Sequence, residues 1–333
     1  MSDKKRLFLI DAYALIFRGY YAFIKNPRIN SKGLDTSAIL GFTNSLFDVI
    51  KREKPDYMAV CFDKGGSQDR IEIFEDYKAN REETPEGIKI AVPIIEDILK
   101  SLNISILVKE GYEADDIIGT IAKKAKTQNF ETYMVTPDKD FAQLVEEDIY
   151  MYRPVFGGGY ETWGVKEVLN KFEISRTSQV IDFLAMKGDS VDNIPGLPGV
   201  GDKTAKKFLK EYGSLENLLE NTIKMGARMI DNLNHLAEKH PVIGDVRGAG
   251  LFCVAELVKD RHTKEPEDEK LVQAVVADCA AQGVLIGATN RSLPGLNNTL
   301  CFSPALIATP DDIDQITDAV DKSLAKIFGS RPL

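Results

Sequence analysis

The sequence predicts an α/β fold in which a mostly parallel sheet is flanked by helices, followed by a small α+β unit. Short, continuous apolar runs recur along the first half of the chain, each followed by acidic residues; they lie at 7–10, 58–62, 104–108 and 132–136. Helical patterns separate the runs, at about 36–52, 85–101 and 114–127. Strands that alternate with such helices form parallel sheets, and continuous apolarity is typical of strands buried on both faces.

The acidic residues that follow the predicted strands gather at one edge of the sheet. In parallel α/β sheets the ligand site lies beyond the carboxyl ends of the strands. Any one of these acids could simply cap a helix, favour its N-terminus or form a turn. Their repetition favours a cation site, since like charges at one edge repel one another unless cations hold them. The acids are Asp11, Asp63, Glu113, Asp115, Asp116, Asp138 and Asp140.

The other metal-binding residue types do not support a different site. The four cysteines are widely spaced without a C-x-x-C pair, which argues against a disulfide framework and a zinc site. All three histidines lie late in the chain. Hydrolysis in the first two thirds would therefore use carboxylates and metal-bound water. Ligand sets made only of oxygen select hard ions, here Mg²⁺ or Mn²⁺.

Composition indicates an ordinary globular protein, with 44% hydrophobic and 28% charged residues among 333. No apolar run approaches the roughly 20 residues that span a bilayer. The opening apolar run ends at Asp11 without a cleavage-site pattern. We therefore expect a cytoplasmic protein without a membrane partner.

The segment between residues 64 and 85 is polar and carries both basic and acidic residues. Its cations and aromatics have spacings that predict one face of a helix; they are Arg70, Phe74, Tyr77, Lys78 and Arg81. Lysine and arginine contact phosphates, and Tyr77 would stack on a base. A solvated charged helix is the alternative, because glutamates and aspartates are interspersed.

A glycine-rich stretch follows Asp189 and Asp192 and opens a further helix. Glycines between two helices let backbone N–H groups approach a phosphate, and lysines at the helix start add positive charge. The pattern predicts binding to the DNA backbone through Gly196, Gly199, Gly201, Lys203, Thr204, Lys206 and Lys207. By contrast, we assign no chemistry to the hairpin predicted around Gly157–Gly159.

The formal net charge of −9 normally counts against a nucleic-acid partner. With Asp189 and Asp192 included, however, the acids nominated as metal ligands number nine. They equal the whole excess of 51 acids over 42 bases, since 51 − 42 = 9. The rest of the surface would be formally neutral, so net charge decides nothing here.

Residues 1–222 resemble the 5′-nuclease domain of bacterial DNA polymerase I, a member of the flap endonuclease family. The motifs that carry the resemblance are LFLIDAYALIFRGYYAF, CFDKGG, YKANREETP, GYEADDIIG, MVTPDKDFAQL and MKGDSVDNIPGLPGVGDKTA. They occur in the family's order and at similar spacing. The resemblance implies a metal-dependent α/β nuclease domain over 1–170, of the PIN or flap-endonuclease type. A helix-hairpin-helix subdomain, truncated relative to the family, would follow over 171–222.

The resemblance also implies roles for individual residues. One metal ion would bind Asp11, Asp63, Glu113, Asp115 and Asp116, and a second Asp138, Asp140, Asp189 and Asp192. Arg18, Tyr77, Lys78 and Arg81 match positions around the scissile phosphate and the helical arch. Lys78, Arg81, Asp115 and Asp138 would be catalytic, and the glycine hairpin would grip DNA and hold K⁺. The implied substrate is DNA with 5′ ends or flaps.

Residues 223–333 resemble instead the C-terminal small domain of a class III, pyridoxal-phosphate-dependent aminotransferase. The resemblance is carried by GARMIDNLNHLAEKHPVIGDVRGAGLFCVAELVKDRHTKEP and NTLCFSPALIATPDDIDQITDAVDKSLAKIFG. Patterns in this segment predict helices near 225–239, 267–282 and 311–328 and strands near 251–257, 284–287 and 299–302. The family's cofactor site belongs to a large domain that this chain does not contain, so pyridoxal phosphate is not expected.

We therefore interpret the chain as a Mg²⁺-dependent 5′-nuclease joined near residue 223 to an aminotransferase fragment. Without a large domain to pack against, the apolar segments 251–254 and 300–302 are expected to be uncovered. Two alternatives stay open. The chain could be a DNA-binding module with impaired cleavage, or a pyridoxal-phosphate protein dominated by the C-terminal fragment. The sequence does not predict an oligomeric state.

Overall fold

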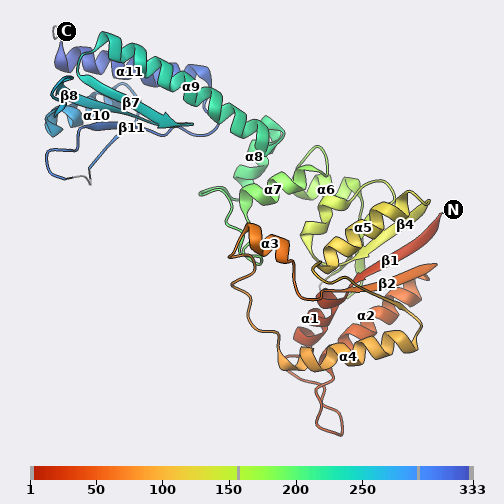
Figure 1. The fold of residues 1–333 in the computed structure, drawn as a ribbon. Coiled ribbons are helices and arrows are strands. Elements are labelled where there is room, and N and C mark those ends of the chain that lie inside the picture. The colour runs from red at the N-terminus through yellow and green to blue at the C-terminus, as the bar shows by residue number, and fades with distance from the viewer. Residues whose placement is uncertain (1–3, 156–157, 291–292, 330–333) are drawn as a thin grey trace. The chain divides into compact units, whose positions relative to one another are not determined.

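The computed structural model describes residues 4–155, 158–290 and 293–329 (Figure 1). The chain forms two compact units, residues 1–211 and 212–333. No helix in the described ranges is both long enough and apolar enough to cross a membrane.

A six-stranded sheet organises the first unit, in the order β3-β2-β1-β4-β5-β6. The β5–β6 pair is antiparallel and the other pairs are parallel, which confirms the predicted fold class. The strands are β1 (Lys5–Asp11), β2 (Tyr57–Phe62), β3 (Ser105–Val108), β4 (Phe130–Val135), β5 (Ile149–Pro154) and β6 (Tyr160–Trp163). Gly157, in the predicted turn between the last two, lies outside the described residues.

The central strand is buried on both faces, as its continuous apolarity predicts. Leu9 pairs with Ala59 on one side and Met134 on the other, and Phe8, Leu9 and Ile10 are fully buried. The chain leaves β1 for β2 on one side, while β4 lies on the other. The carboxyl end of β1 is therefore the topological switch point at which such sheets bind ligands.

Three helices share a core with one face of the sheet: α1 (Ala12–Ala22), α2 (Ser37–Glu53) and α4 (Glu86–Ser101). In Figure 1, α5 (Ala114–Lys126) lies on the opposite face. Contact between α1 and α2 depends on glycine, because a Cβ added at Gly41 would lie 2.3 Å from Cα of Gly19. This close crossing holds α1, and the acid at its N-terminus, against the sheet.

Short helices complete the first unit. They are α3 (Gln68–Ile73), the 3₁₀ helix η1 (Lys139–Leu144), α6 (Val165–Phe172), α7 (Gln179–Lys187) and α8 (Asp202–Tyr212). The single helical face predicted for residues 70–81 is wrong. The helix ends at Ile73, because Phe74 is extended, and Lys78 has a φ of 57°. Turns, and not helical periodicity, determine where the side chains between residues 74 and 81 point.

The second unit is a small α+β fold with an antiparallel sheet in the order β10-β11-β8-β7, and β9 pairs with β8. Its elements are α9 (Leu215–Lys239), β7 (Ile243–Ala249), β8 (Phe252–Asp260), β9 (Glu265–Pro266), α10 (Glu269–Ala281), β10 (Gly287–Ala288), β11 (Thr299–Phe302) and α11 (Pro310–Phe328). The residue predicted as the junction of the two segments, 223, lies inside α9. The sequence did not predict β7, whose side chains after Ile243 are mostly exposed.

The apolar segments of the second unit are less exposed than predicted. Leu251, Cys253, Leu300 and Phe302 are all buried, and they pack in one core with side chains from α9, α10 and α11. Phe252 is the exception, with 64% of its surface exposed. The helices of the unit itself therefore cover most of these side chains, which the sequence predicted to be uncovered.

Candidate active site

A cavity of about 520 Å³ opens at the carboxyl ends of the central strands. Of the nine acids predicted as metal ligands, all but Asp116 line it. They come from the ends of β1, β2 and β4, from the start of α5 and from the segment after α7. The acids are Asp11, Asp63, Glu113, Asp115, Asp138, Asp140, Asp189 and Asp192.

Asp11 is held by two groups at the end of β1. As the N-cap of α1, it accepts a hydrogen bond at Oδ1 from the backbone N–H of Ala14, at 3.2 Å. Its Oδ2 accepts one from the hydroxyl of Thr136 on the adjacent loop, at 3.0 Å. The same hydroxyl accepts from the N–H of Asp138 at 3.2 Å. Thr136 therefore links the acids that follow β1 and β4.

The start of α5 forms a capping box. Glu113 is the N-cap, and the carboxylate of Asp116 accepts from the Glu113 N–H at 3.0 Å. Asp63, directly after β2, accepts at Oδ1 from the N–H of Ala114. The helix N-terminus thus fixes three acids in place, because its free N–H groups need acceptors.

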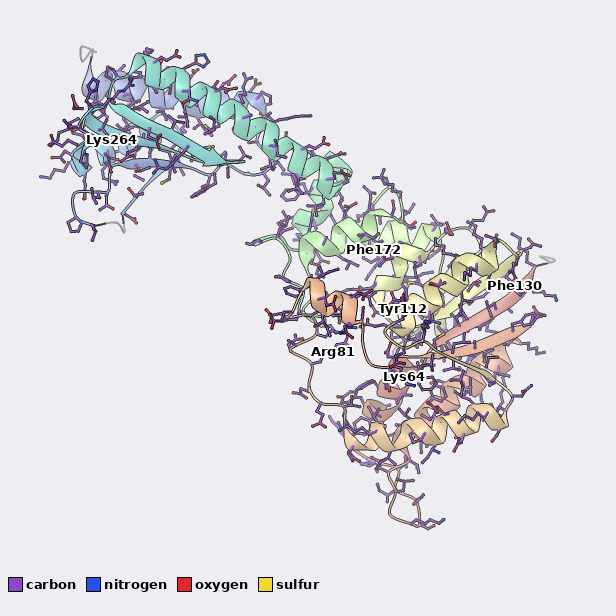
Figure 2. All side chains as sticks on the ribbon, viewed as in Figure 1. Lys64, Arg81, Tyr112, Phe130, Phe172 and Lys264 are labelled. Carbon is purple, nitrogen blue, oxygen red and sulfur yellow. The ribbon has the colours of Figure 1, made fainter. Side chains whose placement is uncertain are left out.

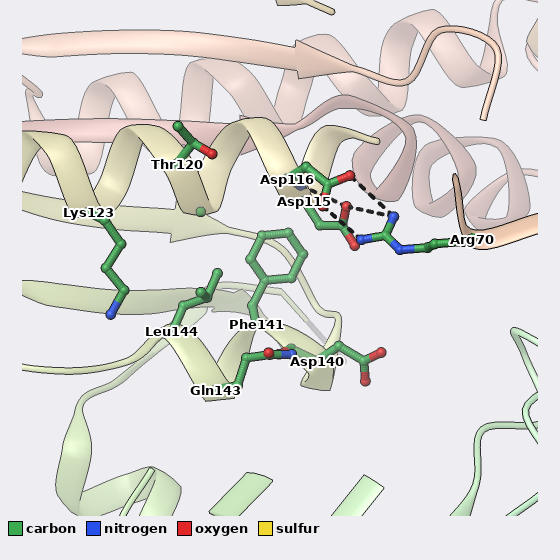
Figure 3. A pocket seen from close by; sticks show the side chains of 10 residues that line it. Arg70, Asp115, Asp116, Thr120, Lys123, Asp140, Phe141, Gln143 and Leu144 are labelled. Atoms are coloured by element: carbon green, nitrogen blue, oxygen red, sulfur yellow. Dashed lines mark hydrogen bonds and ion pairs between the residues drawn. The ribbon is translucent and has the colours of Figure 1, made fainter. Parts of the chain in front are cut away.

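Arg70 lies against the acids at the start of α5 (Figure 3). Its Nη2 is 2.7 Å from Oδ1 of Asp116, and its Nη1 is 3.0 Å from Oε2 of Glu113. Arg70 and Asp116 line a second cavity of about 350 Å³, which shares Asp115 and Asp140 with the first. The predicted DNA contact Arg70 is therefore paired with three neighbouring acids, since Asp115 lies 4.0 Å away.

The other predicted cations also contact acids. Lys78 Nζ lies 2.6 Å from Glu113, and Arg81 Nη2 lies 2.5 Å from Asp192. Tyr77 donates its hydroxyl toward Glu113 at 3.2 Å and Asp192 at 3.3 Å. Figure 2 shows Arg81 on the segment that follows α3. The side chains of Lys78 and Arg81 line the cavity and partly neutralise its negative charge.

Burial raises the pKa of several of these carboxyl groups. The pKa of Asp11 rises to about 7, mainly through burial and further through the charges of Asp63 and Asp138. Burial with the neighbouring Asp138 and Asp189 raises the pKa of Asp140 to about 7. For Asp115, burial and Asp116 raise the pKa to about 6, against the opposing charge of Arg70. The cavity therefore concentrates carboxyl groups whose charged form a bound cation would stabilise.

Sequence reasoning missed the role of Lys139. Its Nζ lies 2.8 Å from Oδ2 of Asp189. Burial opposes ionisation of Asp189, but this ammonium and the Val191 N–H outweigh it and lower the pKa of the carboxyl. A signal was present in the sequence, because Lys139 lies between two nominated ligands in PDKDF.

The chemistry of the donor set fits hard divalent ions. All eight acids offer only oxygen, and one buried oxygen, Oδ1 of Asp140, has no hydrogen-bond partner among the described residues. Within the same residues, no three His, Cys, Asp or Glu side chains converge closely enough to chelate one ion. The carboxylates share a cavity, but the assignment of each to an ion stays a prediction.

The predicted DNA-backbone residues lie in the connection between α7 and α8 and in the first turns of α8. Backbones approach closely there, since a Cβ at Gly196 would lie 2.2 Å from the carbonyl carbon of Lys187. Gly199 has a φ of 79°, which favours glycine. The set comprises Gly196, Gly199, Gly201, Lys203, Thr204, Lys206 and Lys207; among these described residues none lines the acidic cavity.

The lysines of this set differ in their surroundings. Lys206 donates to Glu173 at 2.7 Å, whereas Lys203 and Lys207 are exposed. Arg18, predicted near the scissile phosphate, lies on α1 and donates to the backbone oxygen of Val155 at 3.2 Å. The exposed lysines on α8 are thus the better placed for a phosphate backbone.

Two family models match adjoining parts of the chain. The model described as "5′-3′ exonuclease, N-terminal resolvase-like domain" matches residues 6–173, and "5′-3′ exonuclease, C-terminal SAM fold" matches residues 175–245. The second match extends past residue 222, where the resemblance seen in the motifs ends.

Relatives match different lengths of the chain. A 5′-3′ exonuclease of Aquifex aeolicus (strain VF5) is 40% identical over 217 residues, which cover 65% of this chain and 73% of that protein. DNA polymerase I of Caldicellulosiruptor bescii is 34% identical over 278 residues, 81% of this chain but 32% of that one. A hypotaurine/taurine–pyruvate aminotransferase of Paracoccus denitrificans (strain Pd 1222) is 74% identical over 113 residues, 34% of this chain and 25% of that one. The aminotransferase match covers a separate segment.

Solved structures show a related fold. The bacteriophage T5 flap endonuclease, in a pseudo-enzyme–product complex with DNA and metal ions, matches 65% of this chain and 78% of its own, with a TM-score of 0.52 and 21% identity. At this identity the likeness concerns the fold alone.

Proposed function

Since this chain belongs to the 5′-3′ exonuclease family, we propose that it hydrolyses DNA phosphodiester bonds near 5′ ends or flaps with the help of Mg²⁺ or Mn²⁺. One observation carries the proposal: carboxylates from five separate segments line one cavity at the topological switch point of the sheet, beside Lys78 and Arg81. The T5 relative, whose structure contains DNA and metal ions, supports this class of partner.

Two ions would be held by this chain. The first group of ligands would be Asp11, Asp63, Glu113, Asp115 and Asp116, and the second Asp138, Asp140, Asp189 and Asp192. When bound, such ions supply an activated water and stabilise the attacking and leaving oxygens of an in-line displacement. The protein would present these ligands from strand ends and from a helix N-terminus.

Lys78 and Arg81 would bind the negative charge of the scissile phosphate. In the structure both side chains lie against acids, at 2.6 Å from Glu113 and 2.5 Å from Asp192. Cations that bind these acids would compete with the two side chains for the same oxygens. We therefore propose that Lys78 and Arg81 turn from the carboxylates to the phosphate when cations occupy the site. Tyr77 would then lie next to the same DNA strand.

The glycine connection before α8 would grip the duplex. Its N–H groups and the exposed Lys203 and Lys207 would contact backbone phosphates, and K⁺ would bind among the carbonyl groups of the connection. Arg18 would add a contact near the cut. These interactions carry no sequence information, which suits an enzyme that recognises the end or branch of a strand.

We infer further that the residues from about 223 are a fragment of the small domain of a class III aminotransferase. Pyridoxal phosphate is not expected to bind, because its lysine and phosphate site belong to the large domain in that family. A pyridoxal-phosphate protein is therefore the weaker of the two functional interpretations. We also propose that the chain is cytoplasmic.

The decisive experiment is cleavage of a 5′-flap DNA by the full chain with and without Mg²⁺. Cleavage that requires Mg²⁺, and that Asp138→Asn abolishes, would support the proposal. Tight binding of the flap without any product at saturating Mg²⁺ or Mn²⁺ would identify a binding module instead. Absence of both binding and cleavage would contradict both interpretations.

A further inference from the structure

An arginine on β5 reaches the loop that carries two of the cavity acids. Arg153 donates through Nη2 to the backbone oxygen of Pro137 at 3.0 Å. Pro137 directly precedes Asp138 and follows the end of β4 at Val135. Arg153 itself lines the cavity beside Pro137 and Asp138. The arginine therefore holds the backbone at the point where the chain turns from β4 into the acidic loop.

The β5–β6 hairpin fixes this guanidinium from two further directions. Its Cζ lies 3.9 Å from the ring centroid of Trp163, and its Nη1 lies 3.1 Å from Oε1 of Glu161. Trp163 is only 8% exposed, so the ring has little freedom to move. A planar guanidinium stacks flat on a ring and donates in two fixed directions at once, a geometry that the compact ammonium of lysine does not reproduce.

One donor of the Arg153 guanidinium is left without a partner in the described part of the chain. The Nε of Arg153 is buried, and among the described residues it has no hydrogen-bond partner. Folded proteins rarely leave such a donor unpaired, and the exceptions call for an explanation. One explanation is that the contacts of the guanidinium with Pro137, Glu161 and Trp163 fix its position and outweigh the missing hydrogen bond at Nε.

Few hydrogen bonds and ion pairs among the described residues hold the acidic loop, which we define as Pro137–Asp140. Thr136 accepts from the Asp138 N–H, and Asp138 accepts from the Asp140 N–H at 3.0 Å. These bonds are local and do not tie the loop to another strand, except through the hydroxyl of Thr136 to Asp11. Arg153 supplies the connection to β5. Without Arg153, only the ion pair of Lys139 with Asp189 and the Thr136 hydroxyl would tie this segment to other described parts of the unit, and neither reaches β5.

We propose that Arg153 is a positioning residue that sets the Pro137–Asp140 loop so that Asp138 and Asp140 can hold a divalent ion. This inference rests on the proposed function, because it concerns the same ion site. Groups that orient metal ligands from behind change metal affinity or activity by about 10–100-fold when removed. The role is separate from catalysis, since Arg153 would act through the loop.

The test measures Mn²⁺ binding to the full chain without DNA, from the electron paramagnetic resonance signal of free Mn²⁺. We expect Arg153→Ala and Arg153→Lys each to weaken one Mn²⁺ by about 10-fold or more, the same ion that Asp138→Asn removes. Arg52→Ala is the matched control, because Arg52 forms an ion pair with Asp48 on α2 and does not line the cavity. Its Mn²⁺ affinities should equal those of the unmodified chain.

The possible results separate the two levels of the inference. If the unmodified chain binds no Mn²⁺, the proposed function fails and this inference fails with it. If it binds Mn²⁺ and both Arg153 variants bind as tightly as Arg52→Ala, the positioning role is overturned and the proposed function stands. Circular dichroism identifies a variant that does not fold; should this be Arg153→Ala, the folded Arg153→Lys protein decides the question by the same criterion.

Discussion

Arg70 holds Asp116 by two hydrogen bonds, from Nη2 to Oδ1 at 2.7 Å and from Nη1 to Oδ2 at 3.2 Å. The same Asp116 carboxylate accepts from the Glu113 N–H and so closes the capping box of α5. Arg70 thereby connects the segment after β2 to the start of α5. Its predicted contact with DNA would have to compete with this local role.

We predict that Arg70→Ala lowers the free energy of unfolding by about 1–2 kcal/mol, because its charged hydrogen bonds to the Asp116 carboxylate are lost. The value stays at the low end since the side chain is 35% exposed and solvent screens the pair. Urea unfolding without divalent ions measures it. Arg52→Ala, which breaks an exposed ion pair on α2, should cost under about 0.5 kcal/mol. Equal effects of the two substitutions would contradict the anchoring role.

The buried acid at the end of β1 predicts an unusual dependence of stability on pH. The pKa of Asp11 is raised from 3.8 to about 7 in the folded protein, so the folded state binds more protons than the unfolded state between these values. Stability should therefore fall as pH rises from 5 to 7 when divalent ions are absent. One such group contributes at most about 1.4 kcal/mol per pH unit.

Asp11→Asn should reduce this dependence without abolishing it, because the amide does not titrate, whereas Asp140 and Asp115, whose pKa values are raised to about 7 and about 6, still do. Urea unfolding at pH 5, 6, 7 and 8 in a chelator would measure it, with Asp97→Asn, an acid with 78% of its side chain exposed, as the control. Carboxyl groups with lowered pKa values, such as Asp189 and Glu53, lose their contributions to stability only at lower pH. They therefore do not affect the change in stability between pH 5 and 7. An unchanged pH dependence in Asp11→Asn would show that other groups cause it.

Loss of one ligand should strongly slow cleavage without preventing DNA binding. We expect Asp115→Asn and Asp138→Asn each to lower the cleavage rate by about 100–1000-fold, since several kcal/mol of charge stabilisation are lost with an ion. DNA binding should be equal or tighter, because each substitution removes a negative charge near the phosphate. Single-turnover cleavage and binding to a 5′-flap DNA measure the two effects. Normal cleavage at limiting Mg²⁺ would exclude both residues as ligands.

The sequence predicted the sheet, its flanking helices and the edge at which acids gather, because buried parallel strands leave a strong apolar pattern. It did not predict the route of residues 74–81, where the backbone of Phe74 ends the helix and Lys78 adopts a positive φ. Nor did we predict that Arg70 and Lys139 lie against acids, since ion pairs between distant segments leave no periodic signal; for Lys139 the only signal was its place between Asp138 and Asp140. Arg153 was missed for the same reason: its partner is a backbone oxygen.

Exposed lysines on α8 should govern the salt dependence of DNA binding. Lys203→Ala with Lys207→Ala is expected to reduce the slope of log affinity against log salt by about 2, since each phosphate contact releases roughly one counterion. The control is Lys51→Ala with Lys124→Ala, which removes two exposed lysines from α2 and α5. Measurement over a range of KCl concentrations compares the slopes. Equal slopes for both double variants would show that the glycine connection before α8 is only a structural turn.

The last prediction concerns the boundary between the units. The resemblance to an aminotransferase predicts a junction near residue 223, but a cut there would fall inside α9 and separate its start from Met225, Met229 and Leu233, which lie in the core of the second unit. In addition, Asn221 donates to the backbone oxygens of Leu306 and Ala308, at 2.9 and 3.2 Å. Residues 215–222 are therefore part of that unit by packing.

We expect limited proteolysis of the full chain to release a resistant fragment that begins near residue 212, after Lys210 or Tyr212, and not one that begins after Lys224. Residues 212–333 expressed alone should unfold in one cooperative transition, because they contain their own core, whereas residues 225–333 should be less stable or unfolded. Mass spectrometry of the digest and thermal unfolding by circular dichroism give the two readouts. A resistant fragment that begins at residue 225, with a melting temperature equal to that of the longer one, would place the structural boundary where the sequence resemblance changes.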